Sequence, residues 1–333
     1  MSAAAISAVR CLVVGQFPPP DLELIRRAIP ADRAELVLAE PAEDLARLGK
    51  FEVIWRLFPA ETDGVARDQL SEALDTHPEV RWVHTASAGI DQLATLLVDR
   101  PNTILTHSAG VTAIPIAEFV VGCLLHHFKR VPELAQLQQR RQSVQLTLRE
   151  LGDLRVVLFG LGAIGSEVAR RLFPFGCQLV GVRRDPSRPS PAGVTEVFGP
   201  QELARACHGA DALVLVAPLT SDTERAVDAG VLSQLAERSV VVNVARGGLV
   251  DESALLAALA LGRPGAAYLD TFVEEPLPQE SPFWTAPGAH VSPHLSWSSS
   301  HLGLRTSQLF TEQLSRWLAR EPLLNLADPR AGY

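Results

Sequence analysis

Apolar and polar residues alternate along the chain in a pattern that predicts parallel β-sheets. Short apolar runs predict strands, and the segments between them with apolar residues at helical spacing predict helices. The first series has predicted strands at Val9–Gly15, Glu35–Ala39, Phe51–Trp55, Trp82–Thr85 and Ile104–His107, and predicted helices at Asp21–Ala28, Pro41–Leu48 and Val65–Asp75. Strands separated by helices in this way form βαβ units, and such units build a parallel sheet.

Two predicted helices follow this first series. The first carries an apolar stripe at steps of three and four residues, made of Ile116, Phe119, Val120, Cys123, Leu124, His127 and Phe128. The second runs from about Pro132 to Arg149 and contains the polar run 136–142. We expect this polar helix to be solvated or to lie across a partner subunit.

The alternation then restarts and predicts a second parallel sheet. Its strands are predicted at Val156–Phe159, Gln178–Val182, Ala212–Val216, Val240–Val244, Ala266–Leu269 and His290–Ser292, and its helices at Ile164–Phe173, Gln201–Cys207, Asp228–Glu237 and Glu252–Leu261. A last helix is predicted at His301–Ala319. The pattern therefore indicates an α/β protein with two parallel sheets joined by long helices.

Composition narrows the class of protein. At about 100 to 200 residues per domain, the 333 residues predict two domains, and 47% hydrophobic residues exclude a disordered chain. A net charge of −8 argues against nucleic acid as a partner. No apolar run is long enough to span a membrane, and Arg10 interrupts the apolar stretch near the N-terminus, so we expect a cytoplasmic protein. The four cysteines are widely spaced, which favours reduced, buried thiols over disulfides or a metal site.

A glycine-rich turn links a predicted strand to a predicted helix. The strand ending at Phe159 runs directly into Gly160-Leu-Gly162-Ala163-Ile164-Gly165. In this context the first glycine permits a tight turn, the second lets the backbone approach a pyrophosphate, and the third lets helix and strand pack closely. The helix start then offers unpaired N–H groups to phosphates. The alternative is a tight turn without a ligand.

The position that reads the ribose carries arginines. An acidic residue after the next strand would accept the 2′-hydroxyl of NAD, but Arg183 and Arg184 stand there. A guanidinium can bind a 2′-phosphate through two hydrogen bonds. The sequence therefore predicts NADP(H) as the preferred cofactor, with NAD(H) as the alternative if the two arginines are only solvated.

Three polar residues follow successive strands of the second sheet. Arg246, Glu275 and His294 come after the strands ending at Val244, Leu269 and Ser292. Ligands of open α/β sheets bind at these strand ends. Each residue alone has an ordinary structural explanation, but together they supply a cation for a carboxylate, a proton donor and a carboxylate that keeps the donor charged. This set is what the reduction of a carbonyl group requires.

Ordered motifs along nearly the whole chain resemble the D-isomer-specific 2-hydroxyacid dehydrogenase family. They are 87–91 (Ser-Ala-Gly-Ile-Asp), Ala117-Glu118, the glycine turn 160–165, Pro218-Leu-Thr220, 243–251 (Asn-Val-Ala-Arg-Gly-Gly-Leu-Val-Asp), Asp270 to Pro276, and Pro293-His294. The arginine pair is similar to the NADPH-using glyoxylate and hydroxypyruvate reductases of this family. The resemblance implies reduction of a small 2-oxo acid to the D-2-hydroxy acid, and the reverse, by hydride transfer.

The resemblance also implies residue roles. Arg246 would bind the substrate carboxylate and carbonyl oxygen, His294 would be the general acid and base, and Glu275 would pair with His294 and favour its imidazolium form. The backbone N–H groups of Ala88 and Gly89 would bind the carboxylate as well. Beyond the glycine turn and the two arginines, the implied cofactor contacts are Ala217, Pro218, Thr223, Val244, Ala245, Asp270 and His294.

The family further implies a discontinuous domain order. The substrate domain would comprise residues 1–107 and 298–333, and the dinucleotide-binding Rossmann domain residues 108–297, with the active-site cleft between these two Rossmann-like or flavodoxin-like domains. The helical region 112–149 matches the segment through which members dimerise, so a homodimer is expected.

The substrate itself is less defined by the sequence. Trp55, Arg56 and Trp297 are expected to face the substrate, where two bulky rings would suit apolar 2-oxo acids and Arg56 would suit a second anionic or hydroxyl group. Alternatively, Trp55 is a core residue and Arg56 is solvated. A different functional class also remains open, namely a dinucleotide-sensing corepressor of the same fold with little turnover. Formate oxidation is disfavoured, because the resemblance would then require a glutamine at Glu275.

Overall fold

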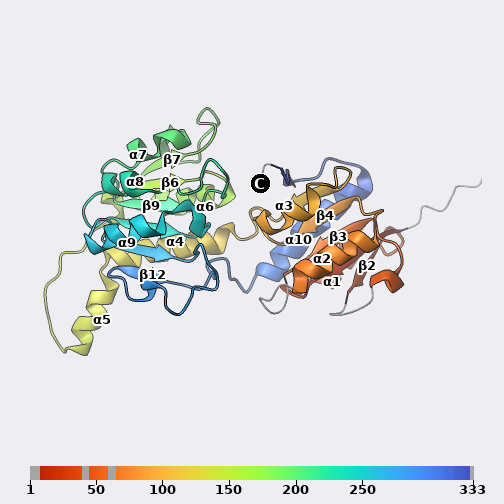
Figure 1. Cartoon of the computed structure of the whole chain (residues 1–333), viewed down its shortest axis with the longest axis horizontal. Coiled ribbons are helices and arrows are strands. Elements are labelled where there is room, and N and C mark those ends of the chain that lie inside the picture. Colours follow the sequence, from red (N-terminus) through yellow and green to blue (C-terminus); the bar gives the residue numbers. More distant parts are fainter. Residues whose placement is uncertain (1–7, 40–44, 59–64, 331–333) are drawn as a thin grey trace, which may run out of the picture. The chain divides into compact units, whose positions relative to one another are not determined.

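The chain forms two compact units, each built on one mainly parallel sheet (Figure 1). The computed structural model describes residues 8–39, 45–58 and 65–330. Unit 1 comprises residues 1–112 and 299–333, and unit 2 comprises residues 113–298. The two sheets with their flanking helices confirm the predicted α/β class.

Unit 1 has a six-stranded sheet in the order β13-β5-β4-β3-β1-β2, in which only β13 is antiparallel to its neighbour. Its strands are β1 (Val9–Val14), β2 (Ala34–Leu38), β3 (Val53–Arg56), β4 (Trp82–Thr85), β5 (Ile104–His107) and β13 (Leu326–Ala327). Its helices are α1 (Leu22–Ala28), α2 (Val65–Thr76), α3 (Asp91–Leu97) and α10 (Leu302–Ala319).

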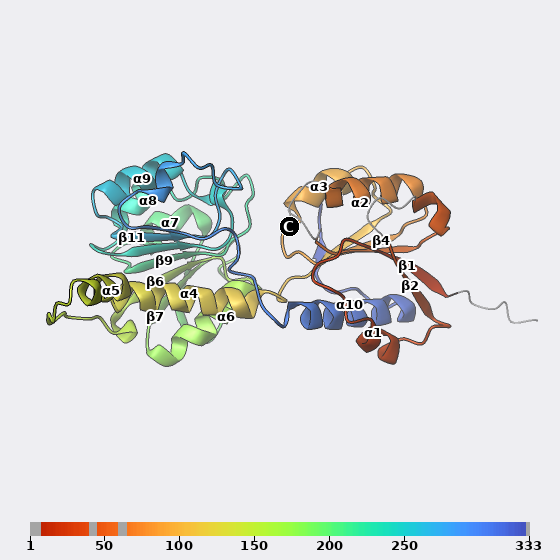
Figure 2. The same ribbon diagram turned by 90° about the horizontal axis from the view of Figure 1, so that it is seen from below.

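The helices of unit 1 cover both faces of this sheet (Figure 2). On one face, Ile54 of β3 packs in a core cluster with Leu70 of α2 and Leu93 of α3. On the other face, α1 and α10 close a second cluster, in which the ring of Trp55 stacks on that of Phe310 with centroids 4.0 Å apart. Side chains alternate between the faces of a strand, so the neighbours Ile54 and Trp55 enter different cores.

The position of Trp55 corrects one sequence-based expectation. The side chain was expected to face the substrate, but it is fully buried in the core between β3 and α10. Strand β3 is buried on both faces. Its apolar run therefore does not show whether an aromatic side chain lies in the core or at the end of the sheet where a ligand binds. The alternative, that Trp55 is a core residue, is the one the structure supports.

Unit 2 has a seven-stranded parallel sheet in the order β12-β11-β10-β9-β6-β7-β8. Its strands are β6 (Arg155–Phe159), β7 (Gln178–Val182), β8 (Val194–Phe198), β9 (Ala212–Leu215), β10 (Val240–Asn243), β11 (Ala266–Leu269) and β12 (Ala289–Val291). Its helices are α4 (Ala113–Phe128), α5 (Val131–Gln139), α6 (Ala163–Leu172), α7 (Leu203–Ala206), α8 (Ala229–Gln234) and α9 (Glu252–Ala260). Helices α7, α8 and α9 cover one face, and α4 and α6 cover the other (Figure 2).

Several predicted elements differ from the observed ones. The helix predicted from Pro132 to Arg149 ends at Gln139, and residues 142–150 are not helical. No residue of α5 is buried, so there is no packed face to extend this helix through the polar run. The pattern missed α3, β8 and β13. Of the helix predicted at Pro41–Leu48, residues 41–44 lie outside the described ranges and Leu45–Leu48 form a single 3-10 turn.

Two other expectations concern membranes and cysteines. Within the described ranges, no helix is both long and apolar enough to cross a bilayer. Cys11, Cys123, Cys177 and Cys207 are all buried and free, as the spacing predicted. Burial raises the pKa of each thiol, which keeps the four side chains in the protonated form.

The stacked pair Trp55 and Phe310 generates a stability prediction. Phe310→Ala should lower the free energy of unfolding of unit 1 by about 3–5 kcal/mol, because it leaves a cavity beside a fully buried indole. Denaturant unfolding followed by tryptophan fluorescence measures this change. Phe173→Ala is the matched control, since 54% of that phenylalanine is exposed, and should change stability by less than about 0.5 kcal/mol. Equal effects of the two substitutions would contradict the packing described.

Candidate active site

The glycine turn between β6 and α6 leaves space only at its middle glycine. A Cβ on Gly160 would lie 2.7 Å from the backbone nitrogen of Ala217, and one on Gly165 would lie 2.0 Å from the carbonyl oxygen of Gly160. Both glycines are thus required by packing inside unit 2. A Cβ on Gly162 would meet no described atom within 4 Å. The open space at Gly162 is a cradle in which a ligand can approach the backbone closely.

The start of α6 borders this cradle. Gly162 is the N-cap, and Ala163 and Ile164 form the first turn of the helix. The first N–H groups of an α-helix have no partner within the helix, and the helix dipole favours negative charge there. The turn therefore fits the pyrophosphate of a dinucleotide, which would lie against the N–H groups of Gly162, Ala163 and Ile164.

The two arginines after β7 have different surroundings. The guanidinium of Arg183 donates to the carbonyl oxygens of Arg188 and Pro189, so it holds the following loop in place. Arg184 is exposed. The predicted pair is thus split into one arginine that organises the loop and one on the surface.

The remaining predicted cofactor residues lie at the ends of β9 and β10. Ala217 touches the glycine turn, and the hydroxyl of the buried Thr223 donates to the carbonyl of Pro218 over 2.7 Å. Val244 and Ala245 are buried directly after β10. The side chain of Thr223 therefore stabilises the 218–223 loop and is not directed at the surface.

Asn243 fixes the backbone on which Arg246 stands. Its buried side chain accepts from the N–H of Ala245 over 3.1 Å and donates to the carbonyl of Arg246 over 2.9 Å. The guanidinium of Arg246 donates to the carbonyl of Ala245 over 2.7 Å. Sequence reasoning did not single out Asn243, although its place at the end of a fully buried strand is a signal for a buried polar residue with a local task.

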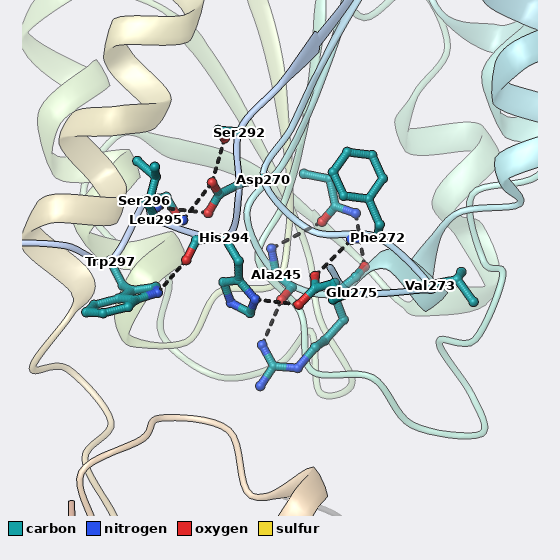
Figure 3. Close-up of polar contacts among 12 residues, drawn as sticks. Ala245, Asp270, Phe272, Val273, Glu275, Ser292, His294, Leu295, Ser296 and Trp297 are labelled. Carbon is teal, nitrogen blue, oxygen red and sulfur yellow. Dashed lines mark hydrogen bonds and ion pairs between the residues drawn. The ribbon is translucent and has the colours of Figure 1, made fainter. Parts of the chain in front are cut away.

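His294 and Glu275 form a hydrogen-bonded pair (Figure 3). The distance from His294 Nδ1 to the Glu275 carboxylate is 2.8 Å, and the N–H of Phe272 donates to the other carboxylate oxygen over 2.9 Å. Partial burial alone would raise the pKa of Glu275, but these hydrogen bonds and the charges of His294 and Arg246 hold it below its ordinary value. Glu275 is therefore a carboxylate at neutral pH, and it can accept a hydrogen bond from Nδ1 of His294.

Asp270 anchors the loop that carries His294 (Figure 3). Its buried carboxylate accepts from the hydroxyl of Ser292 over 2.5 Å and from the N–H groups of Leu295 and Ser296 over 3.0 and 2.9 Å. The sequence-based expectation gave Asp270 a cofactor contact. In the structure its carboxylate bonds to both sides of the histidine loop, and the cofactor contact stays a prediction.

Trp297 supports the same loop from its C-terminal side. Its indole N–H donates to the carbonyl of His294 over 2.7 Å. His294 has a φ of +49°, a left-handed backbone conformation that is uncommon for a residue with a side chain. The indole hydrogen bond and the Asp270 carboxylate together hold this conformation.

In unit 1, the loop after β4 is bonded through its carbonyl groups. The carbonyl of Ala88 contacts Nδ1 of His107 at 2.6 Å, that of Ser87 accepts from the N–H of Ser108, and that of Gly89 accepts from the hydroxyl of Ser87. By contrast, the N–H groups of Ala88 and Gly89 donate to no acceptor among the described residues. The carbonyl groups of this loop are thus already bonded, whereas two of its N–H groups are not. Such a surplus of backbone donors is typical of an anion-binding site.

His107 and Ser108 are therefore residues that sequence reasoning missed. They act on the backbone of the 87–89 loop from the end of the neighbouring strand β5. The hydroxyl of Ser108 also donates to the carbonyl of Thr85 over 2.8 Å. Their position at the end of a strand is the only signal that the sequence offered.

Arg56, the last residue of β3, is buried at the same end of this sheet. Only 5% of the residue is exposed, so the alternative of a solvated Arg56 does not hold. Its guanidinium lies 5.9 Å from the centre of the Phe58 ring. Burial lowers the pKa of Arg56, but an arginine remains charged at any pH at which the protein is folded.

A family model for the NAD-binding domain of D-isomer specific 2-hydroxyacid dehydrogenases matches residues 121–296, which is more than half of the chain. Among curated proteins, the glyoxylate/hydroxypyruvate reductase A of Klebsiella pneumoniae (strain ATCC 700721 / MGH 78578) is 32% identical over 276 residues. This alignment covers 78% of the chain and 87% of the relative.

Solved structures of similar proteins match nearly the whole chain. A D-isomer specific 2-hydroxyacid dehydrogenase of Xanthobacter autotrophicus Py2, in complex with NADPH and MES, is 27% identical with a TM-score of 0.83, over 98% of this chain and 100% of that one. An NADPH-dependent glyoxylate/hydroxypyruvate reductase of Sinorhizobium meliloti, in complex with NADP and sulfate, is 26% identical with a TM-score of 0.81 at the same coverage. The chain belongs to the family of D-isomer specific 2-hydroxyacid dehydrogenases.

Proposed function

We propose that the protein reduces a small 2-oxo acid to the D-2-hydroxy acid, and catalyses the reverse, with NADP(H) as its preferred cofactor. The observation that carries this proposal is the pair of His294 and Glu275, 2.8 Å apart, with the charge of Arg246 acting on the same carboxylate. The cofactor supplies the hydride when it is bound. The complete set of three side chains disfavours the alternative of a sensing protein without turnover.

Each side chain has a defined task in this proposal. Arg246 binds the substrate carboxylate and polarises the carbonyl oxygen, because a guanidinium offers several donors and a fixed positive charge. His294, as imidazolium, gives its Nε2 proton to that oxygen as the alcohol forms. Glu275 accepts from Nδ1 and stabilises the charged form of the ring. In the reverse reaction, neutral His294 takes the proton back.

The two units divide the binding tasks. We propose that unit 2 binds the dinucleotide through the glycine turn and that unit 1 binds the substrate. In unit 1, the N–H groups of Ala88 and Gly89 are assigned to the substrate carboxylate, because the described residues leave both donors unused. His107 and Ser108 then serve as positioning residues for this loop.

The preference for NADP(H) rests on the loop after β7. Arg184 is exposed there, while Arg183 shapes the loop through the carbonyls of Arg188 and Pro189. A 2′-phosphate would bind the guanidinium of Arg184. The reductase of Sinorhizobium meliloti, which is similar over nearly the whole chain, is NADPH-dependent.

We also propose a homodimer formed through the region 112–149. Helix α5 has no buried residue, and it extends away from the rest of unit 2 together with the segment that follows (Figure 1). Val131, Leu134, Val144 and Leu148 of this region are each more than 40% exposed. Apolar side chains on a projecting segment without a core of its own are typical of a surface covered by another subunit.

The catalytic pair generates a pH prediction. In Glu275→Gln the reductase kcat should fall by about 10- to 100-fold, because His294 loses the carboxylate that is paired with its Nδ1. The lowered pKa of Glu275 means that its own protonation affects the wild-type rate only below the ordinary range of a glutamate, about pH 4.3. Profiles of kcat against pH measure both effects.

The neighbouring exposed carboxylate gives the matched control for this experiment. Glu274→Gln should leave kcat and the pH profile unchanged, since Glu274 makes no described contact with His294. His294→Ala should lose at least about 100-fold in kcat while its affinity for NADPH stays nearly intact. A His294→Ala variant with wild-type kcat would refute the assigned general acid.

The cofactor assignment is tested by two variants and two cofactors. Arg184→Gln should raise the KM for NADPH by about tenfold or more and leave the KM for NADH within about twofold, because only NADPH carries the 2′-phosphate. Arg26→Gln, an exposed arginine of α1 in unit 1, is the control and should change neither constant. Wild-type enzyme that uses NADH as efficiently as NADPH would contradict the preference.

The dimer is tested by sedimentation. The wild-type protein should sediment at about twice the chain mass of 35.9 kDa, and Leu134→Glu should sediment as a monomer because a buried charge destabilises an apolar interface. Phe173→Glu changes an exposed apolar residue outside the region 112–149 and should remain dimeric. A monomeric wild-type protein would overturn the proposal.

A further inference from the structure

Arg56 is a buried cation without a counter-charge among the described residues. Only 5% of the residue is exposed, and no hydrogen bond or ion pair joins its side chain to a described residue. Its Nε is fully enclosed and has no acceptor in the part of the chain that the structure describes. The described contact of its guanidinium is with the face of Phe58, 5.9 Å from the ring centre.

Such an arrangement is costly unless an anion completes it. A guanidinium does not lose its proton in a protein, so it cannot escape burial by becoming neutral. An uncompensated buried charge destabilises the folded state, and buried charges in proteins are normally paired. A residue that breaks this rule at the end of a strand is a candidate for ligand binding.

The surroundings of Arg56 indicate which ligand it binds. Its backbone carbonyl accepts from the N–H of Ala86 over 2.8 Å, and Arg56 is the register partner of Thr85 in β4. The 87–89 loop, with its unused N–H groups, begins directly after Ala86. Arg56 and this loop therefore leave neighbouring strands at the same carboxyl edge of one sheet, about 5 Å apart in the backbone.

Side-chain direction strengthens this placement. Residues of a strand alternate between faces, so Arg56 points to the same face as Ile54, which packs with Leu93 of α3. The 87–89 loop leads into α3, which covers this face (Figure 2). The side chain of Arg56 thus leaves its strand toward the face covered by the helix into which the 87–89 loop leads.

We propose that Arg56 binds a second anionic group of the substrate and makes the enzyme selective for 2-oxo acids that carry one. This inference rests on the proposed function, in which the 87–89 loop of the same unit binds the first carboxylate. The second group is an oxyanion, either a carboxylate or a phosphate, because a guanidinium binds both through paired hydrogen bonds. The preferred substrates are then dianionic 2-oxo acids.

Matched substrate pairs test the selectivity. Oxaloacetate is compared with 2-oxobutyrate, and 3-phosphohydroxypyruvate with hydroxypyruvate, so that each pair differs mainly in the second anion. In the wild-type enzyme, at least one dianionic member should have a kcat/KM about 10- to 100-fold above its monoanionic partner, as expected for a charge-assisted hydrogen bond. The pair that shows the preference distinguishes carboxylate from phosphate.

Variants of Arg56 attribute this preference to the side chain. Arg56→Met should abolish it and leave kcat/KM for the monoanionic partners within about threefold, and Arg56→Lys should restore part of it because a lysine keeps the charge without the planar fork. Arg26→Met is the control on the surface of α1. An equal loss on dianionic and monoanionic substrates, or no preference in the wild-type enzyme, would overturn the proposal.

A binding measurement without turnover completes the test. D-malate, the hydroxy product of oxaloacetate, should raise the Tm of the wild-type protein and not that of Arg56→Met, whose own Tm should not be lowered, since the variant loses an unpaired buried charge. A strongly lowered Tm of Arg56→Met would indicate a structural role instead. Failure of the proposed function has a different signature, because wild-type enzyme would then turn over none of the four 2-oxo acids.

Discussion

The buried carboxylate of Asp270 determines where His294 lies. It has to be satisfied by donors because an unpaired buried charge is unstable, and it takes all of its described donors from the loop 292–296. These bonds fix the backbone on both sides of His294 and allow its left-handed conformation. The 2.8 Å contact with Glu275 follows from that backbone.

In both units a polar side chain holds the backbone of a loop that follows a strand. The buried Asn243 bonds to the carbonyl of Arg246, and the half-buried His107 bonds to the carbonyl of Ala88. In each case the proposed ligand-binding group lies on a backbone that a neighbouring side chain fixes. A site built on such supports loses little conformational entropy when its ligand binds.

The sequence predicted the sheets and pointed to Arg246, Glu275 and His294, but it did not point to the residues that hold their backbone. Apolar runs mark strands because both sides of a parallel sheet are buried, and Arg246 and His294 were proposed because ligand groups follow such strands. Because both faces of such a strand are buried, the sequence does not show that Trp55 packs in a core rather than faces the substrate. His107 bonds to a backbone carbonyl, and every residue has such a carbonyl. The sequence therefore does not indicate which residue His107 contacts.

The division of the chain has a consequence for synthesis on the ribosome. Unit 2 is continuous from residue 113 to 298, whereas unit 1 needs α10, which comes after it. Until α10 leaves the exit tunnel, the face of the first sheet that holds Trp55 and Trp82 has no helix bearing Phe310 to cover it. Synthesis of unit 1 thus begins before that of unit 2 and ends after it. A nascent chain of this length therefore exposes an aromatic surface that chaperones recognise.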